Sequence, residues 1–331
     1  MIITRTPFRV SFAGGGSDIE EFYSQCGGAV LSTTIDKYMY IASHRFFDED
    51  KVRVKYSRTE TVTRLEDLEH PILREVLIRF QVRGALEISS NADIPAGSGL
   101  GSSSSFTVGL IHNLHVRAGK YVTKAQLAEE ACDVEINRLQ EPIGKQDQYA
   151  AAFGGLNVFH FHPSGTVGVE PIHLKADVYQ GLQESLLMFH IGGQRMASYV
   201  LAEQKANLRS SPKREVLKRM VDFVWELRDA LYDGKLERLG QILDRSWRLK
   251  QQLASKITND AVNGLYQRGL RNGALGGKLL GAGGSGFLLF YCEQKHQGRL
   301  RQALAPLREL KFRFESEGSK IIYVGDEHGC S

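Results

Sequence analysis

This 331-residue sequence has no apolar run long enough to span a bilayer, and residues 1–7 contain no hydrophobic signal core. Its four cysteines never have the C-x-x-C spacing of zinc and redox sites, and their spacing gives no disulfide framework. These cysteines are Cys26, Cys132, Cys292 and Cys330. The net charge is only +4, with basic and acidic residues interspersed, which argues against a dedicated nucleic-acid binder. We therefore expect a cytoplasmic protein that binds neither membrane nor nucleic acid.

The sequence also lacks the two most common nucleotide-binding loops. A Walker A loop is excluded because Asn272 stands where its first glycine belongs, and Leu279 follows Lys278 where its hydroxyl belongs. Residues 281–286 match the letters of a dinucleotide fingerprint, G-x-G-x-x-G. An aromatic and aliphatic run, 287–292, follows them and predicts a strand where the fingerprint needs a helix. A Rossmann dehydrogenase is therefore disfavoured.

Composition and periodicity predict a globular α+β protein of two domains. Hydrophobic residues make up 42% of the chain and charged residues 24%, which is typical of folded domains. Alternating apolar patterns predict strands, and apolar residues at helical spacing predict helices. The expected strands are 8–13, 29–34, 38–43, 52–56, 85–90, 154–161, 186–191, 287–292 and 320–324. The expected helices are 102–118, 123–140, 211–234, 236–253, 259–270 and 294–306. Since the second half is richer in helices, we expect domains at 1–185 and 186–331.

The most informative segment is 92–105, which reads A-D-I-P-A-G-S-G-L-G-S-S-S-S. Gly97, Gly99 and Gly101 allow tight turns and a close approach of a ligand to the backbone. Four serines and an apolar helical pattern follow at once, so we expect the serines to cap a helix. Unpaired N–H groups and the helix dipole make such an end suited to phosphate. A glycine-serine surface loop that only caps a helix is the alternative.

A second glycine loop lies at residues 13–18, A-G-G-G-S-D, directly after a predicted strand. Its glycines would let the backbone approach a ligand, and the Asp18 carboxylate could accept hydrogen bonds from a polyol. Asp18 could equally cap the helix that Ile19, Phe22 and Tyr23 indicate. Both roles are compatible with the sequence.

Together with the loop at 281–286, these segments resemble the three signature motifs of the GHMP kinases. This superfamily includes galactokinase, homoserine kinase, mevalonate kinase and phosphomevalonate kinase. The three motifs occur in the family's order along nearly the whole chain. The opening A-G-G-G-S-D and the segment 144–155, G-K-Q-D-Q-Y-A-A-A-F-G-G, are most similar to the D-glycero-D-manno-heptose 7-phosphate kinase branch. The resemblance implies an N-terminal domain like domain 2 of ribosomal protein S5 and a ferredoxin-like C-terminal domain, with ATP and sugar between them.

The resemblance implies ATP and Mg²⁺ as cofactors. Ser103 and Glu135 match the two Mg²⁺ ligands, and Asp147 matches the catalytic aspartate. Arg9 matches the arginine that faces this aspartate. Without the resemblance, Glu135 reads as a solvated helix carboxylate and Asp147 as a loop cap. The residues expected to bind ATP are Pro95, Gly97, Ser98, Gly99, Leu100, Gly101, Ser102, Ser103 and Ser104.

The sugar site is expected at the opening loop and at two further segments. Asp18 matches the sugar-binding aspartate of the galactokinase opening, but galactokinases carry Glu-His where this chain has Gly15 and Gly16, which argues against galactose. Arg195 follows a glycine turn at a predicted helix start, where its guanidinium would bind a distal phosphate; otherwise it is a surface arginine. The full predicted set is Gly15, Gly16, Ser17, Asp18, Arg195, Gly283 and Gly284.

We therefore predict an ATP-dependent kinase of a small sugar phosphate. The expected acceptor is the anomeric hydroxyl of D-glycero-D-manno-heptose 7-phosphate, giving the 1,7-bisphosphate for the synthesis of nucleotide-activated heptose. One alternative is a kinase of an unphosphorylated sugar such as fucose or galactose. Another is a non-catalytic sensor of nucleotide or sugar, against which the intact Ser103, Glu135 and Asp147 argue. Homodimer formation is left open.

Overall fold

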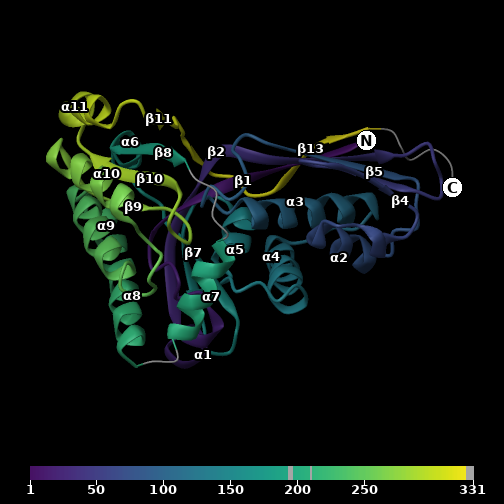
Figure 1. Cartoon of the computed structure of the whole chain (residues 1–331), viewed down its shortest axis with the longest axis horizontal. Helices are drawn as coiled ribbons and strands as arrows, with labels where there is room; N and C mark the ends of the chain where they lie inside the picture. Colours follow the sequence, from purple (N-terminus) through teal and green to yellow (C-terminus); the bar gives the residue numbers. More distant parts are fainter. Residues whose placement is uncertain (193–196, 209–210, 326–331) are drawn as a thin grey trace.

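The computed structural model describes residues 1–192, 197–208 and 211–325 of the chain. Within these ranges the protein is α+β, as predicted, and contains a nine-stranded and a four-stranded sheet. Figure 1 shows the larger sheet extending towards both chain ends, with the helices α2, α3 and α4 along one of its faces. The smaller sheet lies at the other end of the molecule among α6, α9, α10 and α11 (Figure 1).

The larger sheet is antiparallel except where β3 pairs with β5. Its main order is β13-β1-β2-β5-β3-β4, with β6 and β12 also paired to β2 and with β7 paired to β6. Its strands are β1 (Ile2–Ala13), β2 (Gly28–Arg45), β3 (Val52–Lys55), β4 (Thr59–Val62), β5 (Leu86–Ala92), β6 (Leu156–Phe161), β7 (Val167–Pro171), β12 (Phe314–Glu315) and β13 (Lys320–Val324).

The strand β2 is 18 residues long and organises this sheet. The sequence predicted two strands here, at 29–34 and 38–43, and the structure corrects this to one. β1 pairs with β2 on both sides of residues 36–37, where the register between the two strands shifts. On the other side of β2, β6 pairs with its first part and β5 with its last part.

Helices cover the larger sheet with apolar stripes. In α4 the predicted stripe of Leu127 and Ala131 is buried, and Thr123 caps the helix, with its hydroxyl accepting from the Gln126 amide at 3.2 Å. The predicted helix 123–140 is split, because the α-helix α4 passes directly into the π-helix η2. The helical elements of this half are α1 (Glu20–Cys26), η1 (Leu65–Asp67), α2 (Pro71–Arg79), α3 (Ser102–Arg117), α4 (Lys124–Cys132), η2 (Asp133–Arg138) and α5 (Gln146–Phe153).

The smaller sheet has the order β11-β8-β10-β9 and is antiparallel throughout. Its strands are β8 (Leu186–Gly192), β9 (Ala274–Leu279), β10 (Gly286–Cys292) and β11 (Arg308–Glu309). The helices that accompany it are α6 (Ala176–Glu184), α7 (Ala197–Asn207), α8 (Ser211–Tyr232), α9 (Glu237–Lys250), α10 (Asp260–Arg271) and α11 (Gln294–Leu304). The strand predicted after the third glycine loop is confirmed as β10.

The last strands of the described chain return to the larger sheet. Although they follow the helix-rich half, β12 pairs with β2 and β13 with β1. The first strand of the smaller sheet, β8, begins one residue after the predicted domain boundary.

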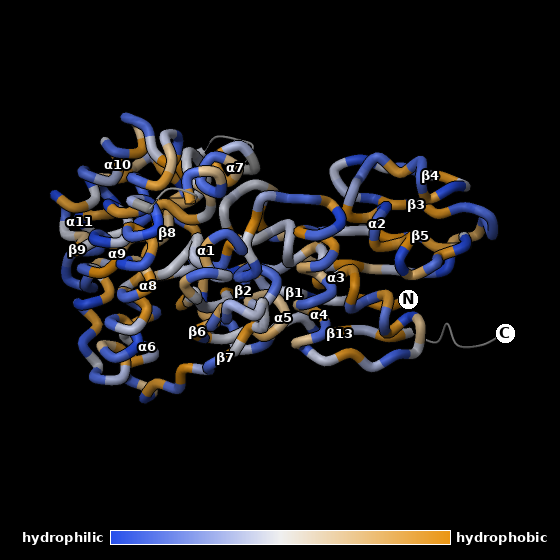
Figure 2. Tube along the Cα trace, turned by 90° about the horizontal axis from the view of Figure 1, so that it is seen from below, coloured by the Kyte–Doolittle hydropathy of each residue, from blue (hydrophilic) through white to orange (hydrophobic). Residues whose placement is uncertain are grey.

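One cluster of buried apolar residues runs through both halves, from β1 to α9 and β10, and a second cluster lies mainly in the helix-rich half. Figure 2 shows orange and blue segments alternating along α8 and α9, as expected of amphipathic helices. Among the described residues, no helix combines the length and the apolar character that a membrane span requires.

Candidate active site

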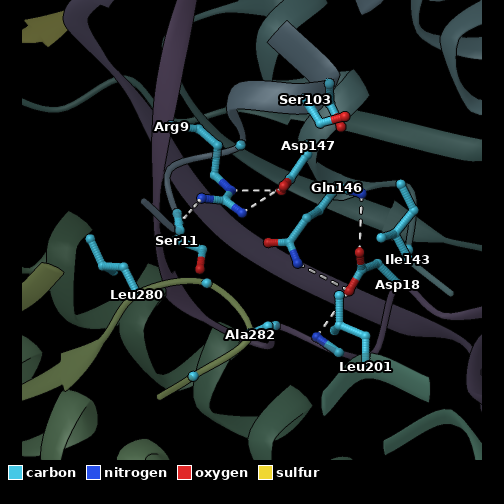
Figure 3. Close-up of a pocket in the computed structure, with 18 of the residues that line it drawn as sticks. Arg9, Ser11, Asp18, Ser103, Ile143, Gln146, Asp147, Leu201, Leu280 and Ala282 are labelled. Atoms are coloured by element: carbon cyan, nitrogen blue, oxygen red, sulfur yellow. Dashed lines mark hydrogen bonds and ion pairs between the residues drawn. The ribbon is translucent and has the colours of Figure 1, made fainter. Parts of the chain in front are cut away.

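A cavity of about 350 Å³ lies where the three glycine loops meet (Figure 3). The loop after β1 supplies Gly15, Gly16 and Asp18, and the loop after β9 supplies Leu280 to Gly283 and Ser285. The loop after β5 and the first turn of α3 supply Gly97, Gly99, Gly101, Ser102, Ser103 and Ser104. Segments as far apart in the sequence as Gly15 and Ser285 therefore line one cavity.

The N-terminus of α3 opens into this cavity. The N-cap residue is Gly101, in the left-handed conformation at φ 77°, and no side chain caps the helix. This corrects the prediction that serines supply the cap. The first backbone bond of the helix runs from the Ser105 amide to the Gly101 carbonyl, so the preceding amides have no partner within the helix. Unpaired amides and the positive end of the helix dipole make this position suited to an anion.

Glycines let the loop after β5 (residues 93–101, the phosphate-type loop) and the loop after β9 touch backbone to backbone. A Cβ on Gly99 would lie 2.5 Å from the Leu280 oxygen, and one on Gly281 would lie 2.4 Å from the Gly99 Cα. Three residues of the predicted nucleotide set, Pro95, Ser98 and Leu100, do not line the cavity. The side chain of Leu100 lies in the core, and its carbonyl accepts from the Arg9 amide at 3.1 Å.

Arg9 and Asp147 form a bidentate ion pair in the cavity wall. The Arg9 Nε and Nη2 donate to the two Asp147 oxygens at 2.6 and 2.7 Å, and the Arg9 Nη1 donates to the Gly99 carbonyl at 2.8 Å (Figure 3). The period of β1 places Arg9 and Ser11 opposite the core residues Phe8 and Val10. Asp147 comes from the first turn of α5. The guanidinium therefore fixes the orientation of this carboxylate.

Ser103 and Glu135 lie side by side at the start of α3. The Ser103 hydroxyl donates to Glu135 Oε1 at 2.7 Å, and the Gln148 amide donates to Oε2 at 2.7 Å. Both donors are neutral, so no positive charge offsets the loss of hydration of the buried carboxylate. Burial therefore raises the pKa of Glu135 to about 7. A hydroxyl and a buried carboxylate are hard oxygen ligands that fit Mg²⁺, with phosphate and water completing its shell.

Asp18 is buried at the opposite side of the cavity. Its Oδ1 accepts from the Gly16 amide at 2.9 Å and from Gln146 Nε2 at 3.2 Å, and its Oδ2 accepts from the Gln146 amide at 3.1 Å. Burial raises the pKa of Asp18. Asp18 does not cap α1, whose N-cap is Ile19. It organises the loop and the Gln146 side chain instead.

Two predicted sugar-site residues have their polar groups engaged elsewhere, and one cannot be placed. The Ser17 hydroxyl exchanges hydrogen bonds with Ala29, donating at 2.9 Å and accepting at 3.1 Å. The Gly284 amide donates to the Ile257 carbonyl at 2.9 Å, whereas its neighbour Gly283 lines the cavity. Arg195 lies outside the described residues.

Sequence reasoning missed several polar side chains of the cavity, among them Gln146, Gln204 and Lys250. The Gln146 Oε1 and Gln204 Nε2 atoms are buried without a hydrogen-bond partner. In Figure 3 the Gln146 oxygen points away from Asp18, towards the side where Ser11 lies. Only Lys250 left a signal in the sequence, since it is a lysine on the apolar stripe of α9, one turn after Trp247.

Comparison with known proteins agrees with this geometry. The family model for the GHMP kinases N terminal domain matches residues 68–155, and the GHMP kinases C terminal model matches 227–311, together more than half of the chain. A D-glycero-alpha-D-manno-heptose 7-phosphate kinase of Campylobacter jejuni is 28% identical over 96% of this chain and 98% of its own length. A galactokinase of Pyrococcus furiosus is 25% identical over 97% of this chain and 97% of its own.

Solved structures share the fold over almost the full length. A D-glycero-D-manno-heptose 1-phosphate kinase from Bacteroides thetaiotaomicron has a TM-score of 0.80 and 22% sequence identity, covering 98% of this chain and 100% of that one. This likeness and the two family-model matches confirm the predicted two-part α+β fold.

Proposed function

Since this chain belongs to the GHMP kinases, we propose that it transfers the γ-phosphoryl group of ATP to a sugar phosphate. The observation that carries the proposal is the convergence of three elements in one cavity. They are the α3 N-terminus, the Ser103–Glu135 pair and the Arg9–Asp147 pair. Phosphoryl transfer depends mainly on positioning and on neutralising charge, and these groups supply both.

The first turn of α3 would hold the ATP phosphates. Its amides and dipole favour an anion, and the loop glycines let the phosphates approach the backbone. Ser103 and Glu135 would hold Mg²⁺, which supplies positive charge to the phosphate oxygens when it is bound.

Asp147 would accept or orient the proton of the attacking hydroxyl. The bidentate arginine holds this carboxylate in one orientation, from which it can act as a base. The acceptor sugar would lie between Asp147 and Asp18, beside Gly15, Gly16 and Gln146. There the two glycines leave room that larger side chains would fill.

The proposed acceptor is the anomeric hydroxyl of D-glycero-D-manno-heptose 7-phosphate. The similarity to the Campylobacter jejuni heptose phosphate kinase over nearly the full length of both chains supports it. The second candidate is an unphosphorylated sugar, which the similarity to the Pyrococcus furiosus galactokinase favours. A non-catalytic sensor would not need Asp147, Arg9, Ser103 and Glu135 in their paired arrangement.

An ATP-consumption assay over a panel of acceptors tests the proposal. The panel contains D-glycero-D-manno-heptose 7-phosphate, the same heptose without phosphate, galactose and fucose, and NMR assigns the phosphorylated position. We expect the highest kcat/KM with the heptose 7-phosphate. A preference for a sugar without phosphate would select the second candidate, and no turnover with any member would contradict the assignment as a sugar kinase.

Asp147→Asn tests the catalytic role directly. The variant should bind ATP as the wild type does, because Asp147 does not belong to the α3 turn, but turnover should fall by roughly 10²- to 10⁴-fold. Calorimetry with ATP and steady-state rates at saturating substrates measure the two effects. Wild-type turnover in this variant would remove Asp147 from the proton transfer.

A further inference from the structure

Lys250 is a lysine at the C-terminal end of α9 whose side chain is buried in the wall of the active-site cavity. Only 8% of the residue is exposed, and its ammonium donates to the Gly281 carbonyl. Gly281 in turn packs against the backbone of Gly99 in the phosphate-type loop. Gly281 therefore holds the Lys250 ammonium beside the phosphate-type loop. Lys250 and Gly281 belong to the second half of the chain, whereas this loop belongs to the first.

A second buried lysine shows what a purely structural ammonium looks like in this protein. Lys278 is 3% exposed, and its ammonium donates to the Ser11 carbonyl at 2.9 Å, the Ser11 hydroxyl at 3.4 Å and the Phe12 carbonyl at 3.5 Å. An ammonium has three donors, so Lys278 is satisfied by protein oxygens. Among the described residues, Lys250 has one such acceptor and no carboxylate within ion-pair distance.

The charges around Lys250 favour an anion. Burial and the nearby positive charge of Arg9 lower the pKa of Lys250 to about 8, while Asp18 and Asp147 act in the opposite direction. Asp147 is engaged by Arg9, and Asp18 accepts three hydrogen bonds from Gly16 and Gln146. The nearest carboxylates are thus occupied, and an incoming anion would satisfy the free donors of the ammonium.

We propose that Lys250 is a catalytic residue that donates hydrogen bonds to the γ-phosphoryl group of ATP during its transfer. This inference rests on the proposed kinase function and adds a cation from the second half of the chain to the site. In the step, the acceptor oxygen bonds to the γ-phosphorus, and the bond to the β–γ bridging oxygen breaks. The hydroxyl proton passes to Asp147, ADP leaves with the bond electrons, and Lys250 stays protonated throughout.

The position beside Gly99 favours the γ-phosphoryl group over the distal phosphate of the sugar. The contact chain from Lys250 through Gly281 to Gly99 fixes the ammonium against the phosphate-type loop. Arg9 is also bound to the Gly99 carbonyl. Lys250 and Arg9 therefore approach the same end of that loop, and two fixed cations there would stabilise charge that develops on a phosphoryl group in transfer.

Two variants and one control test the proposal. Lys250→Met keeps the length of the side chain and removes the charge, and Lys250→Arg restores a charge. Arg248→Met is the control, because Arg248 lies on the exposed face of the same helix and pairs with Asp244 at 2.9 Å. Calorimetry would measure the binding of ATP and of ADP by each protein, with Mg²⁺ and without sugar.

We expect Lys250→Met to weaken ATP binding or kcat/KM by roughly tenfold to a hundredfold, since a hydrogen bond to a charged group is lost. ADP binding should change little, because ADP lacks the γ-phosphoryl group, and unchanged ADP binding also shows that the variant is folded. Lys250→Arg should recover part of the loss, and Arg248→Met should behave as the wild type.

Other results overturn the inference. Equal weakening of ATP and ADP would show that Lys250 supports the fold of the site. A loss confined to phosphorylated sugars, with normal kinetics on the same sugar without phosphate, would assign Lys250 to the distal phosphate. If the wild type turned over no sugar, the proposed function would fail, yet the ATP and ADP comparison would still decide whether Lys250 contacts a γ-phosphate.

Discussion

The Glu135 carboxylate is buried with only neutral hydrogen-bond donors, and its pKa is raised from 4.5 to about 7. The folded protein therefore binds this proton more tightly than the unfolded chain does. The protonated carboxyl makes its full contribution to the free energy of unfolding below pH 4.5. This contribution is lost as the pH rises from 4.5 through 7. Without a metal ion, the ionised carboxylate destabilises the fold by on the order of 3 kcal/mol.

Glu135→Gln should remove the loss of stability that ionisation of Glu135 causes at high pH. Glutamine cannot ionise, and its amide can be satisfied if Gln148 turns its own amide over, because Gln148 Oε1 is buried without a partner. In buffer with EDTA, the variant should melt at a higher temperature than the wild type at pH 8 and at the same temperature at pH 4. A gain that is equal at both pH values would mean that ionisation of Glu135 is not its cause.

Adding Mg²⁺ and ATP should reverse the order at pH 8. If Glu135 holds the metal, the wild type gains more stability from Mg²⁺-ATP than the variant does, because at a given concentration a ligand that binds the folded state more tightly stabilises it more. A thermal-shift titration at fixed ATP measures this difference. Equal gains would place the metal elsewhere.

Some residues of the site could be predicted from the sequence, and others could not. Asp147, Arg9, Ser103 and Glu135 stand in or near motifs that resemble a family, so the sequence predicts roles for them, and the structure brings them together as two pairs. Gln204 and Lys250 were missed, because their roles depend on where α7 and α9 pack. The lysine on the apolar stripe of α9 is a local signal of burial, but it does not indicate which site the side chain enters.

Two glycines in the phosphate-type loop differ in whether they contact the loop after β9. Gly97 and Gly99 both have positive φ values, 74° and 83°, so alanine costs about 1–2 kcal/mol of backbone strain at either position. A Cβ on Gly99 would also lie 2.5 Å from the Leu280 oxygen, whereas one on Gly97 would meet nothing within 4 Å. The two substitutions therefore differ in the contact between the loops.

Gly99→Ala should weaken ATP binding and kcat/KM at least tenfold more than Gly97→Ala, because it separates the loop after β9 from the phosphate-type loop. Each 1.4 kcal/mol of lost interaction corresponds to about tenfold in affinity. Calorimetry with ATP and steady-state kinetics on both variants provide the comparison. Similar losses in the two variants would show that backbone strain, and not contact between the loops, controls the site.

Local periodicity predicted isolated elements well and long-range pairing poorly. The final strand, 320–324, was predicted with the bounds that β13 has, and the helix 102–118 differs from α3 by one residue. The helix α5, which carries Asp147, was not predicted, since its three successive alanines show no apolar stripe. That β12 and β13 rejoin the larger sheet was not predicted either, because strand pairing depends on the whole chain.

The C-terminal segment connects the two halves of the molecule behind the active site. The Ser319 amide donates to the Ala151 carbonyl at 2.9 Å, and the Ser319 hydroxyl bonds to that of Thr6 at 2.9 Å. Residues 314–319 therefore brace α5, whose first turn carries Asp147. The division into domains 1–185 and 186–331 stays a prediction, and a fragment cut at residue 185 would lose this brace.

Gly318 is a point of close backbone approach between this segment and α5. A Cβ there would lie 2.1 Å from the Ala152 oxygen, and φ of Gly318 is not in the left-handed region, so a substitution acts through the contact alone. Gly318→Ala should destabilise the protein by at least about 1–3 kcal/mol, as overpacking does, and should lower kcat by shifting α5. ATP affinity should fall less than kcat, because α3 is not displaced.

Gly298→Ala is the matched control. Gly298 lies on the exposed side of α11, and a Cβ there would meet nothing within 4 Å. Since alanine is the better helix former, this variant should be more stable by about 0.5–1 kcal/mol, with unchanged kinetics. Thermal melts and saturating-substrate rates on both variants measure the contrast. If Gly318→Ala retained the melting temperature and kcat of the wild type, the C-terminal segment could not be what holds α5, and with it Asp147, against Arg9.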